Sequence, residues 1–190
     1  MDNKWIVLGA AVVGVVIIAI FAFLWFFGTH NFFVGLEKNV EEKQANLEAQ
    51  YQRRVDLIPN VVATVKGATG FEQSTLEEIT RLRSQWQTQP EQRLETANQI
   101  ESTLSKILSI SENYPELRAT EQFQTLIVEL EGTENRISFA RQEFNASIKQ
   151  YNTELALFPG SFVAGFYGFK EKKFFQAEEG ADKAPKVDFG

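Results

Sequence analysis

Apolar residues are unevenly distributed along this chain, and their longest uninterrupted run lies near the N-terminus. Residues 5–27 contain no charged side chain, and a helix needs about 20 apolar residues to cross a bilayer. Trp5 and Trp25 lie near the two ends of the run, as tryptophan does at membrane–water interfaces. The run is longer than the roughly 7–15 residues of a signal-peptide core. We therefore predict an uncleaved single-pass transmembrane helix over residues 5–27, after a short tail of residues 1–4.

Beyond the apolar run, hydrophobic positions recur every three or four residues, which is the period of an amphipathic helix. No segment shows the alternation typical of a strand. The pattern predicts four helices, over about residues 34–66, 74–86, 90–114 and 120–157. Pro59 lies inside the first of them and is expected to kink it. The fold class is therefore all-α, most simply a four-helix antiparallel (up-down) bundle over residues 28–157 with long first and last helices.

The last predicted helix carries the longest apolar stripe. Its spacings of three and four residues alternate over five heptads, interrupted only by Glu134 and Arg141. Such a stripe is typical of coiled-coil packing. Its members are Phe123, Ile127, Leu130, Ile137, Phe144, Ile148, Tyr151, Leu155 and Phe158.

Composition removes several classes of function. The 19 Lys and Arg against 25 Asp and Glu give a net charge of −6, which argues against a nucleic-acid partner. There is no cysteine and only one histidine, so thiol nucleophiles and sites built from several histidines are excluded. No phosphate-binding loop, dinucleotide fingerprint or nucleophile elbow is found. The sequence predicts a protein that is not an enzyme and has no cofactor, catalytic residue or metal site.

Charged residues fall in register with the apolar stripes of the first and last helices. Arg54 lies in the first stripe and Glu134 in the last, where an unpaired charge would be costly. We predict that Arg53 or Arg54 pairs with Glu134, with Asp56 or Arg141 in the same network. Such a network would fix the register of the helices. The alternative is that these charges reach solvent at the edge of the bundle.

A second apolar surface is expected after the bundle, in residues 158–176, ahead of an acidic, mobile tail over residues 177–190. Its rings and lysines suit three locations: the lipid interface, a neighbouring subunit, or the chain's own bundle. In the anchor, two small residues four positions apart would allow close helix packing in lipid. The candidate oligomer or membrane contacts are Ala10, Gly14, Phe158, Phe162, Phe166, Tyr167, Phe169, Phe174 and Phe175.

Several longer motifs resemble the LemA family of bacterial membrane-anchored proteins. They are QRRVDLIPNVV at 52–62, LEGTENRI at 130–137, the pairs FN at 144–145 and YN at 151–152, and FP at 158–159 with GF at 168–169 and FF at 174–175. The resemblance extends over essentially the whole chain. It implies an N-terminal anchor and a helical bundle, with the bundle in the cytoplasm, but no settled biochemical activity.

The function we predict is that of a non-enzymatic single-pass protein of the bacterial cytoplasmic (inner) membrane. It would self-assemble into a homo-oligomer and scaffold or shape the bilayer, so its partners would be lipid and further copies of itself. The alternative is a membrane-anchored adaptor whose bundle binds another membrane-associated protein, such as a protease or signalling partner. Positive charges on the two sides of the anchor tie, so topology rests on the resemblance alone.

Overall fold

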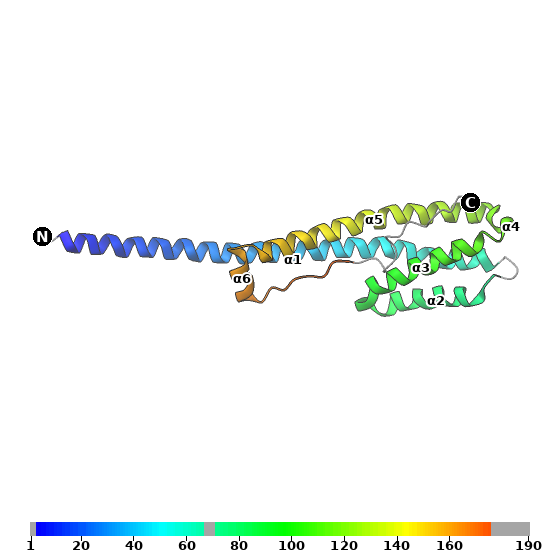
Figure 1. Ribbon diagram of the computed structural model, residues 1–190, viewed down its shortest axis with the longest axis horizontal. Coiled ribbons are helices and arrows are strands. Elements are labelled where there is room, and N and C mark those ends of the chain that lie inside the picture. The colour runs from blue at the N-terminus through cyan, green and yellow to red at the C-terminus, as the bar shows by residue number, and fades with distance from the viewer. Residues whose placement is uncertain (1–2, 67–70, 176–190) are drawn as a thin grey trace, which may run out of the picture. The chain divides into compact units, whose positions relative to one another are not determined.

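The computed structural model describes residues 3–66 and 71–175, apart from the side chains of residues 3–7 and of Ala10. Within these residues the secondary structure is helical and no strand is present, which confirms the all-α prediction. The elements are α1 (Asn3–Lys66), α2 (Gln73–Thr88), the single 3-10 turn η1 (Pro90–Gln92), α3 (Arg93–Ser111), α4 (Pro115–Arg118), α5 (Glu121–Ala156) and α6 (Gly160–Tyr167) (Figure 1).

The apolar run and the first predicted bundle helix are one continuous helix, α1, of 64 residues. Residues 28–33, which the pattern left between two helices, are helical, and Thr29 donates its hydroxyl to the Trp25 carbonyl at 2.9 Å within that stretch. Pro59 lies inside α1 and does not end it. Among the described residues, α1 is the one helix long and apolar enough to cross a membrane.

The described residues form two compact units, and both long helices contribute to each. The anchor unit comprises α1 up to Glu42 and residues 146–174. The head unit comprises residues Lys43–Asn145 together with Phe175.

The core of the head unit is built from the apolar stripes that the sequence pattern picks out. Helix α2 packs against α3 (Figure 1). The four apolar residues of its stripe are all buried: Leu76, Ile79, Leu82 and Trp86. The Trp86 indole donates to the side chain of Gln52 at 2.7 Å, which joins α2 to α1. The fully buried side chains of this core include Leu47, Tyr51, Val55, Ile58, Val61, Ile79, Leu82, Trp86, Ile100, Ile107 and Ile137.

The end of the third predicted helix differs from the prediction. The pattern extends that helix to Pro115, whereas α3 ends at Ser111 and the short helix α4 begins at Pro115. Proline is favoured at the first position of a helix because its missing N–H needs no partner there.

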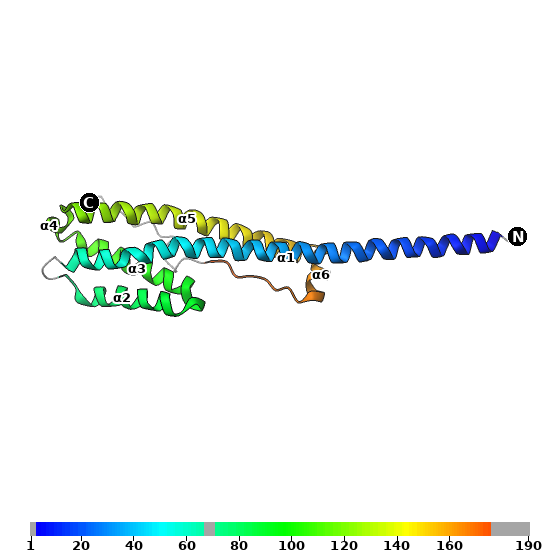
Figure 2. The ribbon, with the colours of Figure 1, turned by 180° about the vertical axis from the view of Figure 1, so that it is seen from behind.

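The anchor unit contains a helix that the sequence analysis missed. Residues 160–167 form α6, which ends at Gly168 with a φ of 78°, a left-handed conformation that suits glycine. The chain then turns back along α5 as an extended segment (Figure 2). Phe158, expected to complete the α5 stripe, is 86% exposed because α5 ends two residues earlier, at Ala156.

Candidate functional site

A buried arginine joins α1 to α5 in the head unit. Arg54 is 4% exposed, and its Nη2 donates to a Glu134 carboxylate oxygen at 2.5 Å. Its Nε donates to the Thr133 hydroxyl at 3.2 Å. Arg53 is exposed, and Asp56 is exposed and accepts a hydrogen bond from Gln52 instead. The structure therefore brings together Arg54 and Glu134 and leaves Arg53 and Asp56 outside that contact.

Arg141 has hydrogen-bond partners of its own on α1 and α3, and its charge also interacts with that of Glu134. Its Nε donates to the Tyr51 hydroxyl at 2.9 Å, and its Nη2 contacts the Glu101 carboxylate. Its guanidinium also lies 5.4 Å from the centre of the Phe175 ring. Burial raises the pKa of Tyr51 to about 12, and Glu101 adds to the rise while Arg141 opposes it. These contacts thus hold a neutral tyrosine against an ion pair.

We expect the stability of the head unit to fall at alkaline pH because of Tyr51. An unfolded tyrosine loses its proton near pH 10, whereas folded Tyr51 keeps it until about pH 12. The unfolded state is therefore favoured increasingly between these two values, by up to about 2–3 kcal/mol. Thermal unfolding followed by circular dichroism should show the gap between wild type and Tyr51→Phe closing as pH rises from about 9 to about 11.5. A gap that stays constant over this range would contradict the assignment.

Two asparagines on α5 hold the extended segment that follows α6. Asn152 binds the backbone of Lys172 at both ends of its amide: its Nδ2 donates to the Lys172 carbonyl at 2.8 Å and its Oδ1 accepts the Lys172 N–H at 3.0 Å. Asn145 makes the same pair of bonds with Phe175, at 3.1 and 2.9 Å. Seven residues of helix and three of extended chain both span about 10 Å. The seven-residue spacing of the two asparagines therefore matches the three-residue spacing of Lys172 and Phe175, whose backbones they bind.

Removing one of these clamps is expected to free the segment locally. Asn152→Ala loses two hydrogen bonds worth together about 1–2 kcal/mol, so backbone amides near Lys172 should exchange with solvent about 5–30 times faster. Thr153→Ala, at the exposed neighbouring position, should leave the rates unchanged. Hydrogen exchange followed by mass spectrometry on residues 168–175 measures both. Equal rates in Asn152→Ala and wild type would show that the clamp does not hold the segment.

The aromatic candidates divide between packed and exposed positions. Tyr167 and Phe169 lie against His30 of α1, with ring centres at 4.2 and 5.9 Å. Phe175 packs on Tyr51 at 6.3 Å. The remaining four are exposed, and a Cβ added at Gly14 would meet nothing within 4 Å, whereas the side chain of Ala10 lies outside the described residues. The exposed four are Phe158, Phe162, Phe166 and Phe174.

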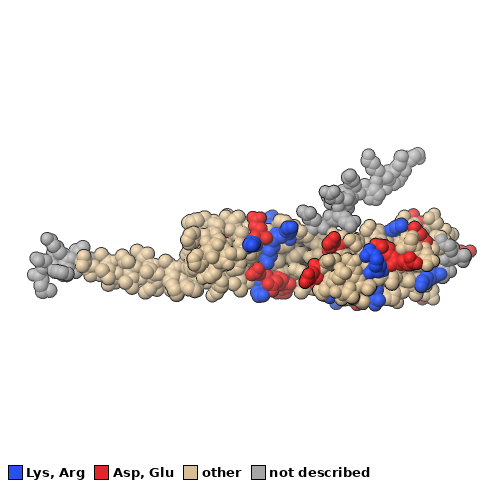
Figure 3. Space-filling view, turned by 90° about the horizontal axis from the view of Figure 1, so that it is seen from below, with Lys and Arg blue, Asp and Glu red and all other residues tan. Residues whose placement is uncertain are grey.

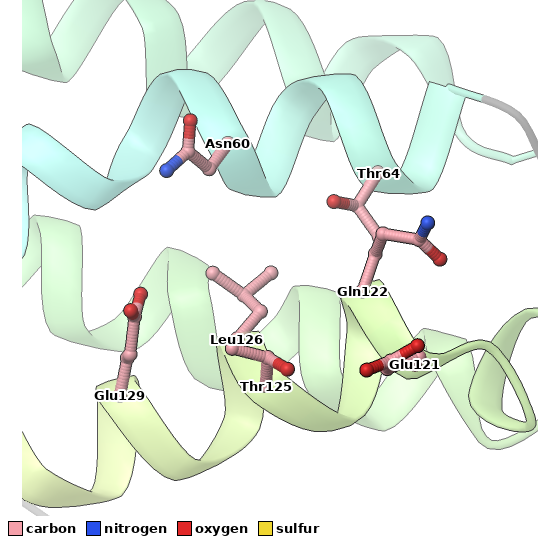
Figure 4. Close-up of a pocket in the computed structure, with 7 residues that line it drawn as sticks. All are labelled: Asn60, Thr64, Glu121, Gln122, Thr125, Leu126 and Glu129. Atoms are coloured by element: carbon pink, nitrogen blue, oxygen red, sulfur yellow. The ribbon is translucent and has the colours of Figure 1, made fainter.

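The head unit also carries a polar groove between the C-terminal part of α1 and the N-terminal part of α5. It encloses about 440 Å³, and Figure 4 shows Leu126 of α5 pointing toward α1. Polar groups surround that leucine and include two carboxylates. The lining residues are Asn60, Thr64, Glu121, Gln122, Thr125, Leu126 and Glu129.

The groove does not supply the groups of a catalytic or metal centre. Among the described residues, no three His, Cys, Asp or Glu side chains lie close enough to hold a metal ion. The two glutamates of the groove are accompanied by amides and hydroxyls rather than by a histidine or lysine that could share a proton with them. The arrangement suits hydrogen bonding to another chain.

The described residues form an all-helical protein. The apolar span of its helix α1 is compatible with a single-pass membrane anchor. Residues 43–189 match the model of the LemA family, and because this match covers more than half of the chain, the chain belongs to the LemA family. The resemblance carried by its motifs is thereby confirmed.

Three relatives illustrate the range of similarity. "Magnetosome protein MamQ 2" of Paramagnetospirillum magneticum is 22% identical over 181 residues, covering 80% of this chain. "Magnetosome protein MamQ" of Magnetospirillum gryphiswaldense is also 22% identical, over 182 residues, with the same coverage. "Protein LemA" of Metamycoplasma hominis is 24% identical over 168 residues, covering 85% of this chain and 75% of that protein. The chain spans 66% of the length of the two MamQ proteins, and none of these names states an enzymatic activity.

Proposed function

We propose that this chain is a non-enzymatic, single-pass protein of the bacterial cytoplasmic membrane that self-assembles and so scaffolds or shapes the bilayer. Its head would be an up-down bundle of α1, α2, α3 and α5, placed in the cytoplasm. The apolar span of α1 supports a role at a membrane, and the bacterial relatives named as magnetosome proteins support a bacterial setting. Arg54 and Glu134 would serve to fix the register of α1 against α5.

One observation on the head unit carries the self-assembly part of the proposal. Val128 and Phe139 of α5 are large apolar side chains that are 68% and 64% exposed. They are eleven residues apart, or about three helical turns, so they lie on one face of α5. Gly132 and Asn135 fall on the same face between them. We call these four residues the α5 strip.

The α5 strip suits packing against a different face of a second copy, because such a head-to-tail contact propagates into a large oligomer whereas strip-to-strip packing closes as a dimer. Its four residues are uncharged, each end presents an apolar side chain, and the Arg136 guanidinium lies beside Gly132. Membrane anchoring confines the copies to a plane and one orientation, which raises their effective concentration. Under those conditions a small interface is enough for association.

The experiment compares two substitutions that add the same charge to neighbouring exposed positions of α5. Phe139→Arg places the charge in the α5 strip, whereas Ser138→Arg places it about 100° away around the helix. The proposal expects Phe139→Arg to reduce the mass of the detergent-solubilised protein, and to abolish any reshaping of reconstituted vesicles seen by electron cryomicroscopy. Ser138→Arg should leave both unchanged. Equal masses for wild type and both variants would contradict the role of the α5 strip.

The groove favours a second candidate function, that of an adaptor. Its carboxylates Glu121 and Glu129 and its amides and hydroxyls suit a basic, hydrogen-bonding segment of another membrane protein. The two functions differ in what they need, because an adaptor requires this groove to stay open. Reversing both charges, by Glu121→Lys with Glu129→Lys, should leave the oligomer mass unchanged if the protein is a scaffold built on the α5 strip. A direct heterologous complex in membranes that this double variant abolishes would favour the adaptor.

A further inference from the structure

The anchor unit has an uncharged region that extends beyond the membrane-spanning run. Residues 5–36 of α1 contain no Asp, Glu, Lys or Arg. Residues 155–169, in the second chain segment of the unit, contain none either. Where charges begin again, the two segments are joined, since Lys172 Nζ lies 2.8 Å from a carboxylate oxygen of Glu37. Figure 3 shows this part of the anchor unit as surface free of charged residues. The uncharged parts of both segments therefore end close to the ion pair of Lys172 with Glu37.

The uncharged part of α1 is too long for the bilayer core alone. At 1.5 Å per residue, residues 5–36 span about 48 Å. The hydrocarbon core is about 30 Å thick, and the headgroup layers bring the total to about 40–45 Å. With residues 5–27 in the core, the turns that follow lie in the headgroup layer of one leaflet.

Helix α6 packs against α1 at that level. The Phe166 ring lies 5.4 Å from the ring of Phe26, and the Tyr167 ring lies 4.2 Å from that of His30. Gly160 approaches so closely that an added Cβ would lie 3.2 Å from the Phe33 ring. These contacts run from the last turn of the predicted span to the turns just beyond it.

Much of the aromatic surface of α6 is uncovered. Val163 and Ala164 are buried, at 0% and 1% exposure. Phe162 is 66% exposed, Phe166 is 71% exposed although its ring also meets Phe26 of α1, and Phe158 just before the helix is 86% exposed. A face of this kind, continuous with a membrane span and followed by Lys170 and Lys173, has the character of a helix that lies in the lipid interface.

We propose that α6 is an interfacial helix that inserts Phe158, Phe162 and Phe166 into the leaflet in which the anchor ends. The occupant of this face is lipid, and the ion pair of Lys172 with Glu37 marks the water side of the headgroup layer. Inserted side chains in one leaflet act as a wedge, which gives the proposed bilayer shaping a physical cause. The inference requires the membrane anchor of the proposed function but not its self-assembly.

The test uses the absence of cysteine from the sequence, which allows single labelled positions in the whole chain. A nitroxide is attached at Phe162→Cys, and the protein is reconstituted in phosphatidylcholine vesicles. Ser84→Cys is the control, since Ser84 is exposed on α2 of the head unit and lies outside the α5 strip. A label at Val12→Cys reports the bilayer core, and a label at Phe166→Cys probes a second position on α6.

Collision with oxygen, which concentrates in lipid, and with a water-soluble nickel chelate gives the depth of each label. We expect positions 162 and 166 to collide severalfold more with oxygen than with the chelate, as position 12 does, while position 84 shows the reverse. Chelate contact at 162 and 166 equal to that at 84 would place α6 in water and overturn the proposal. Protection of both positions from both reagents would mean that protein covers α6, which also overturns it. Neither result depends on oligomer mass, so failure here is distinct from failure of self-assembly.

Discussion

Replacing Glu134 with alanine is expected to lower the free energy of unfolding by about 2–4 kcal/mol. The reason is that Arg54, not Glu134, is the buried partner: the arginine side chain is 5% exposed and the glutamate side chain 46%. Loss of the carboxylate leaves a buried guanidinium whose Nε donates to the Thr133 hydroxyl. Thermal unfolding of the detergent-solubilised chain, followed by far-ultraviolet circular dichroism, measures the change.

The matched variant Arg54→Met should be much less destabilising. It removes the buried charge together with its desolvation cost and keeps an apolar side chain of similar length. The half-exposed Glu134 that remains can be hydrated. In the Arg54→Met background, Glu134→Ala should then cost less than about 1 kcal/mol. If Glu134→Ala and Arg54→Met lowered the free energy of unfolding equally, the deeper burial of Arg54 would not determine the cost of breaking the pair.

Trp86→Ala is expected to destabilise the head unit by about 3–5 kcal/mol, the range for removing a large buried aromatic side chain. Trp86 is 1% exposed, and its ring centre lies 5.9 Å from that of Tyr51. The Arg93 guanidinium lies over the same ring at 5.6 Å. The substitution therefore opens a cavity where α2 meets α1, and unfolding by heat or urea should show it.

Trp86→Phe separates the contribution of packing from that of the indole hydrogen bond. It keeps an aromatic ring against Tyr51. It removes the indole N–H that donates to the side-chain amide oxygen of Gln52 at 2.7 Å. We expect a loss of about 1–2 kcal/mol, well below that of alanine. A loss as large as that of Trp86→Ala would mean that the hydrogen bond, rather than ring packing, dominates at this site.

The helices and the core of this protein follow from hydrophobic spacing because burial decides both. The α2 stripe has spacings of three or four residues, about one helical turn, and all four of its members are buried: Leu76, Ile79, Leu82 and Trp86. The same logic placed Arg54 in the α1 stripe, where it is buried beside Glu134.

Hydrophobic spacing did not predict the features that depend on contacts between residues far apart in the sequence. Arg141 interrupts the α5 stripe as Glu134 does, yet it contacts Tyr51 and Glu101, because the position of α3 is not encoded in the pattern of α5. Helix α6 was missed because eight residues are too few for a periodic signal to emerge. Its formation depends on Phe33 and the close approach of Gly160.

The structure also divides the aromatic C-terminal segment more finely than its composition could. Composition alone treats Phe162 and Phe175 alike, but Phe175 is held by Asn145 and packs on Tyr51, whereas Phe162 is exposed. One segment thus combines an attachment to the chain's own helices with an uncovered face. Self-packing therefore describes Phe175, and membrane contact stays a proposal for Phe162.

We propose that copies of this chain assemble through the α5 strip in the plane of a membrane. The mass of the whole detergent-solubilised chain, measured by light scattering or single-particle imaging in several mild detergents, tests this most directly. We expect a uniform large oligomer whose mass falls in Phe139→Arg and is kept in Ser138→Arg. A monomer or dimer in every detergent would contradict it.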